Sequence, residues 1–140
     1  MSACIIHTNN KIVVFSENKS RLELINNAQE DLEKHQVDGC LVKSGVRCDW
    51  KLVRAATGRE AYIELKGGDV EHAVEQIVQS VKDLTADPNA DKSGYVICTR
   101  SPLASTAIQV LAKKVKRDFN IALRVKKTIF KTTVDEIFDV

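Results

Sequence analysis

The sequence predicts an α/β fold in which helices flank a mixed β-sheet, as a single domain spanning residues 1–140. Short apolar runs of strand length alternate with longer segments in which apolar residues recur at helical spacing. The second half of the chain follows the order strand, helix, strand, helix, strand, which is typical of helices layered on a sheet. With 140 residues, of which 44% are hydrophobic and 29% charged, the chain can bury one sizeable core.

The first third of the chain is predicted to form a hairpin, a helix and a strand. Residues 3–7 and 11–15 are apolar runs separated by Thr8-Asn9-Asn10, and asparagine tolerates turn conformations, which favours an N-terminal hairpin. Residues 19–36 are expected to form a helix because apolar side chains recur along one side. Residues 37–42 are expected to begin the central sheet.

The remainder of the chain has clearer boundaries. Residues 48–55 and 60–66 predict two strands around a short turn, which favours an antiparallel pair, and Gly67-Gly68 ends the second strand. Asp69 is a good N-cap for a helix that runs to about residue 86 with an apolar stripe on one side. The last elements are a buried strand at 95–99, a helix opened by Pro102, and one or two strands within 121–134.

The cysteine content and the hydropathy of the chain predict its compartment. Cys4, Cys40, Cys48 and Cys98 form no CxxC pair, which argues against a zinc site. They are expected to be reduced and packed rather than joined in disulfides. No apolar run approaches membrane-spanning length, and the N-terminus lacks a signal-peptide pattern. We therefore expect a cytoplasmic protein with no membrane partner.

Positive charge is concentrated in the last third of the chain. Residues 113–131 hold eight cations against one aspartate, a net charge of +7, while the remainder holds 13 cations against 18 acids, a net charge of −5. This asymmetry is typical of a surface that meets a polyanion, and equally of a solvated helix face beside an edge strand guarded by lysines. The candidate nucleic-acid contacts are Lys113, Lys114, Lys116, Arg117, Arg124, Lys126 and Lys131.

The most informative pattern is an acid at the start of one predicted strand and an acid-x-base triplet at the end of the next. Asp49 is the first acid, and Glu64-Leu65-Lys66 is the triplet. Strand side chains alternate, so Glu64 and Lys66 share a face. If the strands are neighbours, two carboxylates that suit Mg²⁺ meet an ammonium that can hold a phosphate or a water. The pattern predicts metal-dependent phosphodiester cleavage; the alternative is a surface ion pair of little energetic worth.

With these elements in order, the chain from about residue 19 to residue 100 resembles the PD-(D/E)XK phosphodiesterase superfamily. This is the fold of many restriction endonucleases, Holliday-junction resolvases and λ-type exonucleases. Its core is a helix, three strands, a helix and a strand, with an acid at the second core strand and E-x-K at the third. Asp49, Glu64 and Lys66 match these positions, although Cys48 stands where the name motif has proline.

The resemblance implies a restriction-endonuclease-like fold and an Mg²⁺-dependent endonuclease or exonuclease, with Mn²⁺ as a substitute and DNA as the expected substrate. Asp49 and Glu64 would hold the metal ion together with the backbone carbonyl of Leu65. Lys66 would orient the attacking water or offset charge in the transition state. These four residues form the expected active site.

Further roles implied by the resemblance are less specific. Gln76 matches a helix glutamine that contacts the active site in several branches, and a plain glutamine at the edge of the apolar stripe is the alternative. Some members take another acid from the first helix, for which Glu17 and Glu23 are candidates. A homodimer is also expected. The competing functions are a catalytically inactive interaction module, such as an immunity or regulatory protein, and a nucleic-acid-binding protein without chemistry.

Overall fold

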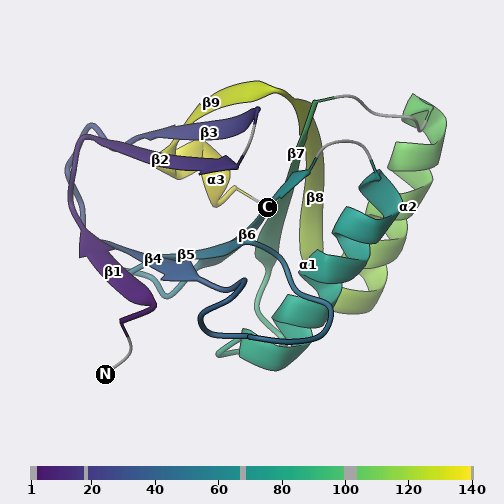
Figure 1. Cartoon of the computed structure of the whole chain (residues 1–140), viewed down its shortest axis with the longest axis horizontal. Coiled ribbons are helices and arrows are strands. Elements are labelled where there is room, and N and C mark those ends of the chain that lie inside the picture. The colour runs from purple at the N-terminus through teal and green to yellow at the C-terminus, as the bar shows by residue number, and fades with distance from the viewer. Residues whose placement is uncertain (1–2, 18, 67–68, 100–103, 140) are drawn as a thin grey trace.

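The computed structural model describes residues 3–17, 19–66, 69–99 and 104–139 and shows an α/β architecture (Figure 1). Its elements in the described residues are, in chain order, β1 (Ile5–Thr8), β2 (Ile12–Glu17), β3 (Ser20–Ile25), β4 (Leu32–Gln36), β5 (Trp50–Arg54), β6 (Glu60–Lys66), α1 (Val70–Leu84), β7 (Lys92–Cys98), α2 (Ser105–Phe119), β8 (Ile121–Lys127), β9 (Ile129–Thr133) and α3 (Val134–Ile137).

The strands form two sheets. The large sheet has the order β1-β4-β5-β6-β7-β8, and the small sheet has the order β2-β3-β9, counted over the described residues. β1, β4, β5 and β6 pair antiparallel with their neighbours, whereas β6, β7 and β8 are parallel. The parallel pairs require crossover connections, and these are supplied by α1 and α2. The large sheet is therefore mixed.

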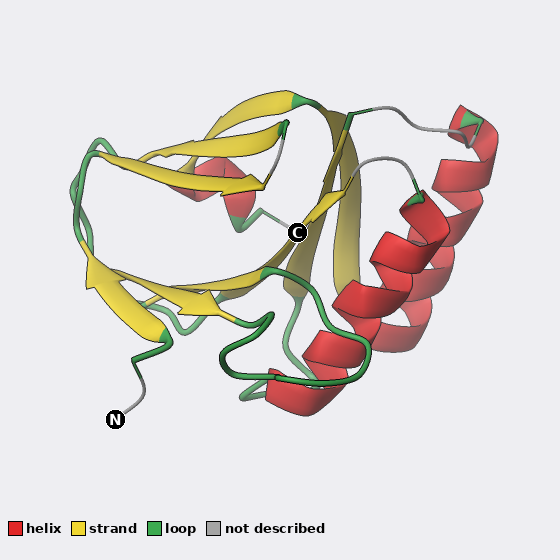
Figure 2. Ribbon diagram, in the orientation of Figure 1, coloured by secondary structure: helices red, strands yellow, loops and turns green. Residues whose placement is uncertain are grey.

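The large sheet is the middle layer of the molecule. α1 and α2 cover one of its faces, and the small sheet with α3 packs against the other (Figure 2). On the helix side, the core is built from residues that include Tyr62, Ile77, Val96 and Ile121. On the side of the small sheet, it is built from residues that include Phe15, Leu22, Ile63 and Ile97.

α1 is fixed in place by its cap and by close packing on β7. Asp69 accepts a hydrogen bond of 3.0 Å from the backbone N–H of His72, which satisfies one of the free donors of the first helical turn. Gly94 in β7 allows close approach of Ile77 on α1 and of Ile121 at the start of β8, because a Cβ there would lie 3.3 Å from Ile77 Cγ2 and 2.9 Å from Ile121 Cγ2. The helix therefore sits close to the sheet that carries the candidate site.

Most of the predicted elements from residue 48 onward are confirmed. β5 and β6 form the expected antiparallel pair, α1 begins after Asp69, and β7 is buried along its whole length. β8 and β9 are the strands expected within 121–134, and they belong to different sheets. Gly67, Gly68 and Pro102 lie outside the described residues. No helix in the described part of the chain is long and apolar enough to cross a membrane.

The predicted N-terminal hairpin pairs the wrong strands. β1 pairs with β4 in the large sheet, and β2 pairs with β3 in the small sheet. The Thr8-Asn9-Asn10 segment passes between the two sheets instead of reversing the chain. The backbone carbonyl of Asn10 accepts a hydrogen bond of 3.1 Å from the side chain of Asn26, so the segment is held by a residue from the end of β3.

The predicted helix at 19–36 and the predicted strand at 37–42 are also wrong. β3 and β4 occupy the first range. They are separated by a turn in which Gln29 adopts a left-handed φ of 48°, a conformation that a right-handed helix cannot continue through. Residues 37–42 form a loop with one bridge, between Asp38 and Val42. The strand that pairs with β5 is β4, slightly earlier in the chain than expected.

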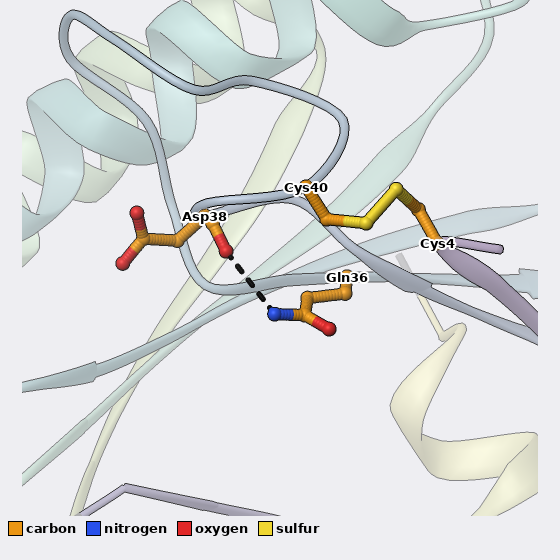
Figure 3. The surroundings of a disulfide bond; sticks show 4 residues. All are labelled: Cys4, Gln36, Asp38 and Cys40. Carbon is orange, nitrogen blue, oxygen red and sulfur yellow. Dashed lines mark hydrogen bonds between the residues drawn. A yellow bond between two sulfur atoms is a disulfide. The ribbon is translucent and has the colours of Figure 1, made fainter. Parts of the chain in front are cut away.

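Cys4 and Cys40 form a disulfide, contrary to the prediction of reduced cysteines. It joins the segment before β1 to the loop between β4 and β5, as Figure 3 shows. The two residues are brought together because the backbone N–H of Gln36 donates to the carbonyl of Cys4 at 2.8 Å. Cys48 and Cys98 are free and buried, as expected.

Candidate active site

Asp49 lies directly before β5, at the end of a loop that spans residues 37–49. Its backbone carbonyl accepts a hydrogen bond of 3.0 Å from the N–H of Val37 and a second of 3.4 Å from Asp38. These bonds close the loop on itself and continue the pairing of β4 with β5. The backbone position of Asp49 is therefore set by the large sheet rather than by the loop alone.

α1 holds the two residues before Asp49 from the other side. The side-chain amide of Gln76 donates a hydrogen bond of 2.9 Å to the carbonyl of Arg47. One helical turn later, Ser80 Oγ accepts a bond of 2.8 Å from the N–H of Cys48. Gln76 therefore anchors the loop that presents Asp49, and its expected contact with the metal site remains a prediction.

Ser80 is a functional candidate that the sequence analysis missed. It is fully buried on α1, on the side of the helix where apolar residues dominate. Buried serines need a partner, and here the partner is the backbone of Cys48. The available signal was a small polar residue inside an apolar stripe, four positions after Gln76, because residues at i and i+4 share a helix face.

The Asp49 carboxylate reaches the end of β6. Its Oδ2 accepts a hydrogen bond of 2.9 Å from the backbone N–H of Leu65. Burial raises the pKa of Asp49 above its ordinary value; the Leu65 bond and a hydrogen bond with the Glu64 side chain oppose this, while the charges of Glu17 and Asp38 add to it. The Asp49 carboxyl group therefore lies beside the backbone of Leu65, the residue next to Glu64, and the Glu64 side chain is near enough to lower its pKa.

Glu64 belongs to the helix side of the large sheet. Its neighbours Ile63 and Leu65 lie in the core beneath the small sheet, so the alternation of β6 directs Glu64 toward the helices. Its side chain is only 3% exposed. Together with Asp49, its charge contributes to raising the pKa of Cys48 to about 12, after the larger effect of burial. Cys48 is therefore an inert thiol beside the acid pair.

The donor set fits a hard divalent cation, because a buried and a half-buried carboxyl group at the same end of two paired strands repel each other unless a proton or a cation offsets their charges. Carboxylate and carbonyl oxygens are the ligands that Mg²⁺ prefers, and it needs only one or two carboxylates. No cluster of three or more His, Cys, Asp or Glu side chains suited to a metal occurs in the described chain. The fit therefore rests on the pair Asp49 and Glu64.

Two of the expected active-site residues are only partly placed. The backbone of Lys66 is the last of β6 and pairs with Cys98 of β7; its side chain lies outside the described residues. Leu65 donates its N–H to Asp49 and buries its side chain on the opposite face. The role of the Leu65 carbonyl as a metal ligand remains a prediction.

Glu17 and Glu23, the two candidates for a further acid of the metal site, lie at different places in the small sheet. Glu17 is the exposed last residue of β2, and its charge acts on Asp49. Glu23 lies in the middle of β3 and pairs with Arg21 at 3.1 Å and Lys131 at 3.7 Å. The small sheet thus brings an acid close to the site from a strand rather than from the expected helix.

The candidate nucleic-acid contacts on α2 lie away from the acid pair. Lys113, Lys116 and Arg117 line a groove between α2 and β8, and Lys114 lines a second groove between α1 and α2. The carbonyl of Asn120, at the end of α2, accepts from the N–H of Lys92 at the start of β7. This end of α2 is therefore at the opposite end of the large sheet from Glu64.

The candidates on the strands face the other side of the large sheet. The guanidinium of Arg124 donates a bond of 3.1 Å to Tyr95 Oη, and Lys126 Nζ lies 5.2 Å from the centre of the Phe130 ring. Three cations of the basic segment are paired with acids: Lys116 with Asp91, Arg117 with Asp118, and Lys131 with Glu23. The positive charge is therefore distributed over both faces and is partly neutralised.

Comparison of the chain with protein-family models, with curated proteins and with solved structures finds no match.

Proposed function

We propose that the protein is an Mg²⁺-dependent phosphodiesterase of the PD-(D/E)XK type that cleaves DNA. The observation that carries the proposal is the hydrogen bond from the Leu65 N–H to Asp49 Oδ2, which brings the Asp49 carboxyl group to the end of β6 beside Glu64. Asp49 lies directly before β5 and Glu64 lies in the adjacent antiparallel strand β6, fifteen positions later in the chain. Glu64 is buried and Asp49 is half-buried, and neighbouring acids removed from water cost stability, which favours a functional role over an accidental one.

The order of elements supports the same proposal. β4, β5 and β6 are followed by α1 and then by β7, parallel to β6, which agrees with the three strands, helix and strand of the superfamily core. One feature departs from that core: the residues before β4 that the structure describes form strands, where the family has a helix.

The proposed chemistry divides between the ion and the chain. When bound, Mg²⁺ supplies Lewis-acid activation of the phosphodiester and of the attacking water. Asp49 and Glu64 would hold the ion, with the carbonyl of Leu65 as a further ligand. Lys66 would orient the nucleophile or offset the charge that develops on the phosphate. Gln76 and Ser80 would keep Asp49 in register with Glu64.

Cleavage of plasmid DNA with and without Mg²⁺ tests the proposal. Glu64→Gln and Lys66→Ala should each lower the rate by about 10²-fold or more, which is typical for the loss of one group that stabilises a transition state. Glu71→Gln is the matched control, because Glu71 is an exposed acid in the first turn of α1. Equal rates in all four proteins, or cleavage that ignores Mg²⁺, would contradict the assignment.

Calorimetry distinguishes the competing functions. An interaction module that keeps the fold without the chemistry should show no heat of binding with Mn²⁺. A nucleic-acid-binding protein without activity should bind DNA with steep salt dependence and be insensitive to Asp49→Asn. The proposed nuclease should bind Mn²⁺ in the wild type and lose that binding in both Asp49→Asn and Glu64→Gln.

A further inference from the structure

The C-terminal ends of β6, β7 and β8 form one edge of the large sheet, because these three strands are parallel. The register pairs Lys66 with Cys98 and Cys98 with Lys127. Lys127, the last residue of β8, is therefore level across the sheet with Lys66, the last residue of β6. Both lie two residues beyond the level of Glu64. It belongs to the edge at which the acid pair lies.

Lys127 also belongs to the correct face of the sheet. Val125 packs against the core beneath α1 and α2, whereas Arg124 contacts Tyr95 on the face of the small sheet. Side chains alternate along a strand, so Lys127, two residues after Val125, lies on the helix side. That is the side on which Glu64 lies, and Lys127 is exposed there.

The charge of Lys127 acts on this edge and is not neutralised locally. Burial raises the pKa of Cys98, and the charge of Lys127 lowers it, so the ammonium influences the end of β7. Lys116, Arg117 and Lys131 are each paired with an acid. Lys127 has no ion pair with any described residue, which leaves its charge available for an anion.

We propose that Lys127 binds a second phosphate of the substrate, so that the nucleic-acid strand crosses the ends of β6, β7 and β8. The inference rests on the proposed function and specifies its substrate. Neighbouring strands are about 4.8 Å apart, so Lys127 is about 10 Å from the Lys66 row measured across two strand spacings. This separation is larger than one phosphate group, so Lys66 and Lys127 would reach different phosphates of the same nucleic-acid strand. The site therefore takes a polynucleotide rather than an isolated phosphodiester.

The test compares kcat/KM for a short single-stranded oligonucleotide and for a dinucleotide, which carries a single phosphodiester. Lys127→Ala should lower the ratio of the two values about tenfold, because the loss of one phosphate contact weakens only the longer substrate by about 1.4 kcal/mol. The salt dependence of oligonucleotide binding should decrease by about one unit of slope. Lys127→Arg should retain most of the preference, because it keeps the charge.

Lys11→Ala is the control, because it removes another exposed lysine, directly before β2, the strand that ends at Glu17. An oligonucleotide preference and a salt slope that are equal in Lys127→Ala and Lys11→Ala would overturn the inference and leave the proposed nuclease intact. Equal losses on both substrates would overturn it too, because they would indicate general damage to the site. A wild type that cleaves neither substrate would overturn the inference together with the proposed function.

Discussion

The backbone N–H of Leu65 donates a hydrogen bond of 2.9 Å to Oδ2 of Asp49. The bond joins the start of β5 to the end of β6 and fixes one oxygen of the acid. It also opposes the burial that raises the pKa of Asp49. A carboxylate whose pKa is raised by burial lowers the stability of the fold, and such groups are common at functional sites. The effect of Asp49 on stability and on activity can be measured separately.

Asp49→Asn should stabilise the protein at neutral pH while abolishing cleavage. The pKa of Asp49 is raised in the folded state, so its deprotonation favours unfolding. The penalty is absent below the unfolded pKa of about 3.9, grows as pH rises toward the folded pKa, and is complete above it. Asparagine avoids the penalty and keeps an oxygen for the Leu65 N–H. Thermal melts across pH should show that the Tm of Asp49→Asn rises relative to the Tm of the wild type as pH increases. A Tm difference that is constant, or that changes in the opposite direction, would contradict the raised pKa.

Mg²⁺ should stabilise the wild type and fail to stabilise Glu64→Gln. A ligand at one hundred times its Kd adds about 2.7 kcal/mol to the free energy of unfolding, which corresponds to a rise in Tm of roughly 10 °C for a chain of this size. Differential scanning fluorimetry with increasing MgCl₂ measures it. Glu75→Gln, which removes an exposed acid of α1, should respond as the wild type does. A similar response in Glu64→Gln would place the ion elsewhere.

Ser80→Ala should destabilise the protein by about 1–3 kcal/mol, because it leaves the buried N–H of Cys48 without its acceptor. Gln76→Ala should have a smaller effect on stability, since the carbonyl of Arg47 is nearer to solvent. Urea unfolding measures both, and Gln79→Ala is the control, because Gln79 bonds only to the exposed Asp83 in the described structure. If Gln76→Ala and Ser80→Ala matched Gln79→Ala, the anchoring of the loop by α1 would be wrong.

Reduction of the Cys4–Cys40 disulfide should lower the free energy of unfolding by roughly 4 kcal/mol in the chain-entropy treatment of a closed loop of this length, which spans 36 positions. Unfolding in denaturant with and without a thiol reductant measures the difference. Cys4→Ser should equal the reduced wild type and be insensitive to the reductant. Alkylation of the unreduced, denatured protein should modify two cysteines; modification of all four would show that the bond does not form.

The part of the fold that the sequence predicted is the part in which local and tertiary signals agree. α1 has a capping acid, a helical apolar stripe and a following loop, and the strands on either side are short and apolar. The pairing of β5 with β6 followed from the short turn between them. The convergence of Asp49 and Glu64 follows from that pairing alone, which is why the acid pair could be anticipated before the structure.

The region before residue 48 was mispredicted because two periodicities overlap there. Leu24, Ala28 and Leu32 match a helical spacing, yet Leu22 and Leu24 are buried while Glu23 between them is partly exposed, which is the alternation of a strand. The left-handed conformation of Gln29 decides between the two readings. It depends on hydrogen bonds from Asn26, whose side chain donates to the carbonyl of Glu30 at 3.0 Å.

The remaining parts of the site depend on contacts between distant segments. Glu17 acts on Asp49 only because the small sheet lies against the large one. The basic segment appeared as one block in the sequence, but the turn from α2 into β8 places Lys113 and Arg124 on different faces of the large sheet. Such placements are set by tertiary packing, which cannot be predicted from the spacing of residues along the chain.

In the small sheet, β3 lies between β2 and β9 and runs parallel to β9, with Arg21 opposite Ile129 and Ile25 opposite Thr133. One edge of β3 therefore stays open during synthesis until residues 129–133 have left the ribosome. A C-terminal deletion that removes β9 would leave a nascent chain with an unpaired strand and a half-covered core. Residues 129–133 are therefore needed for the small sheet to close.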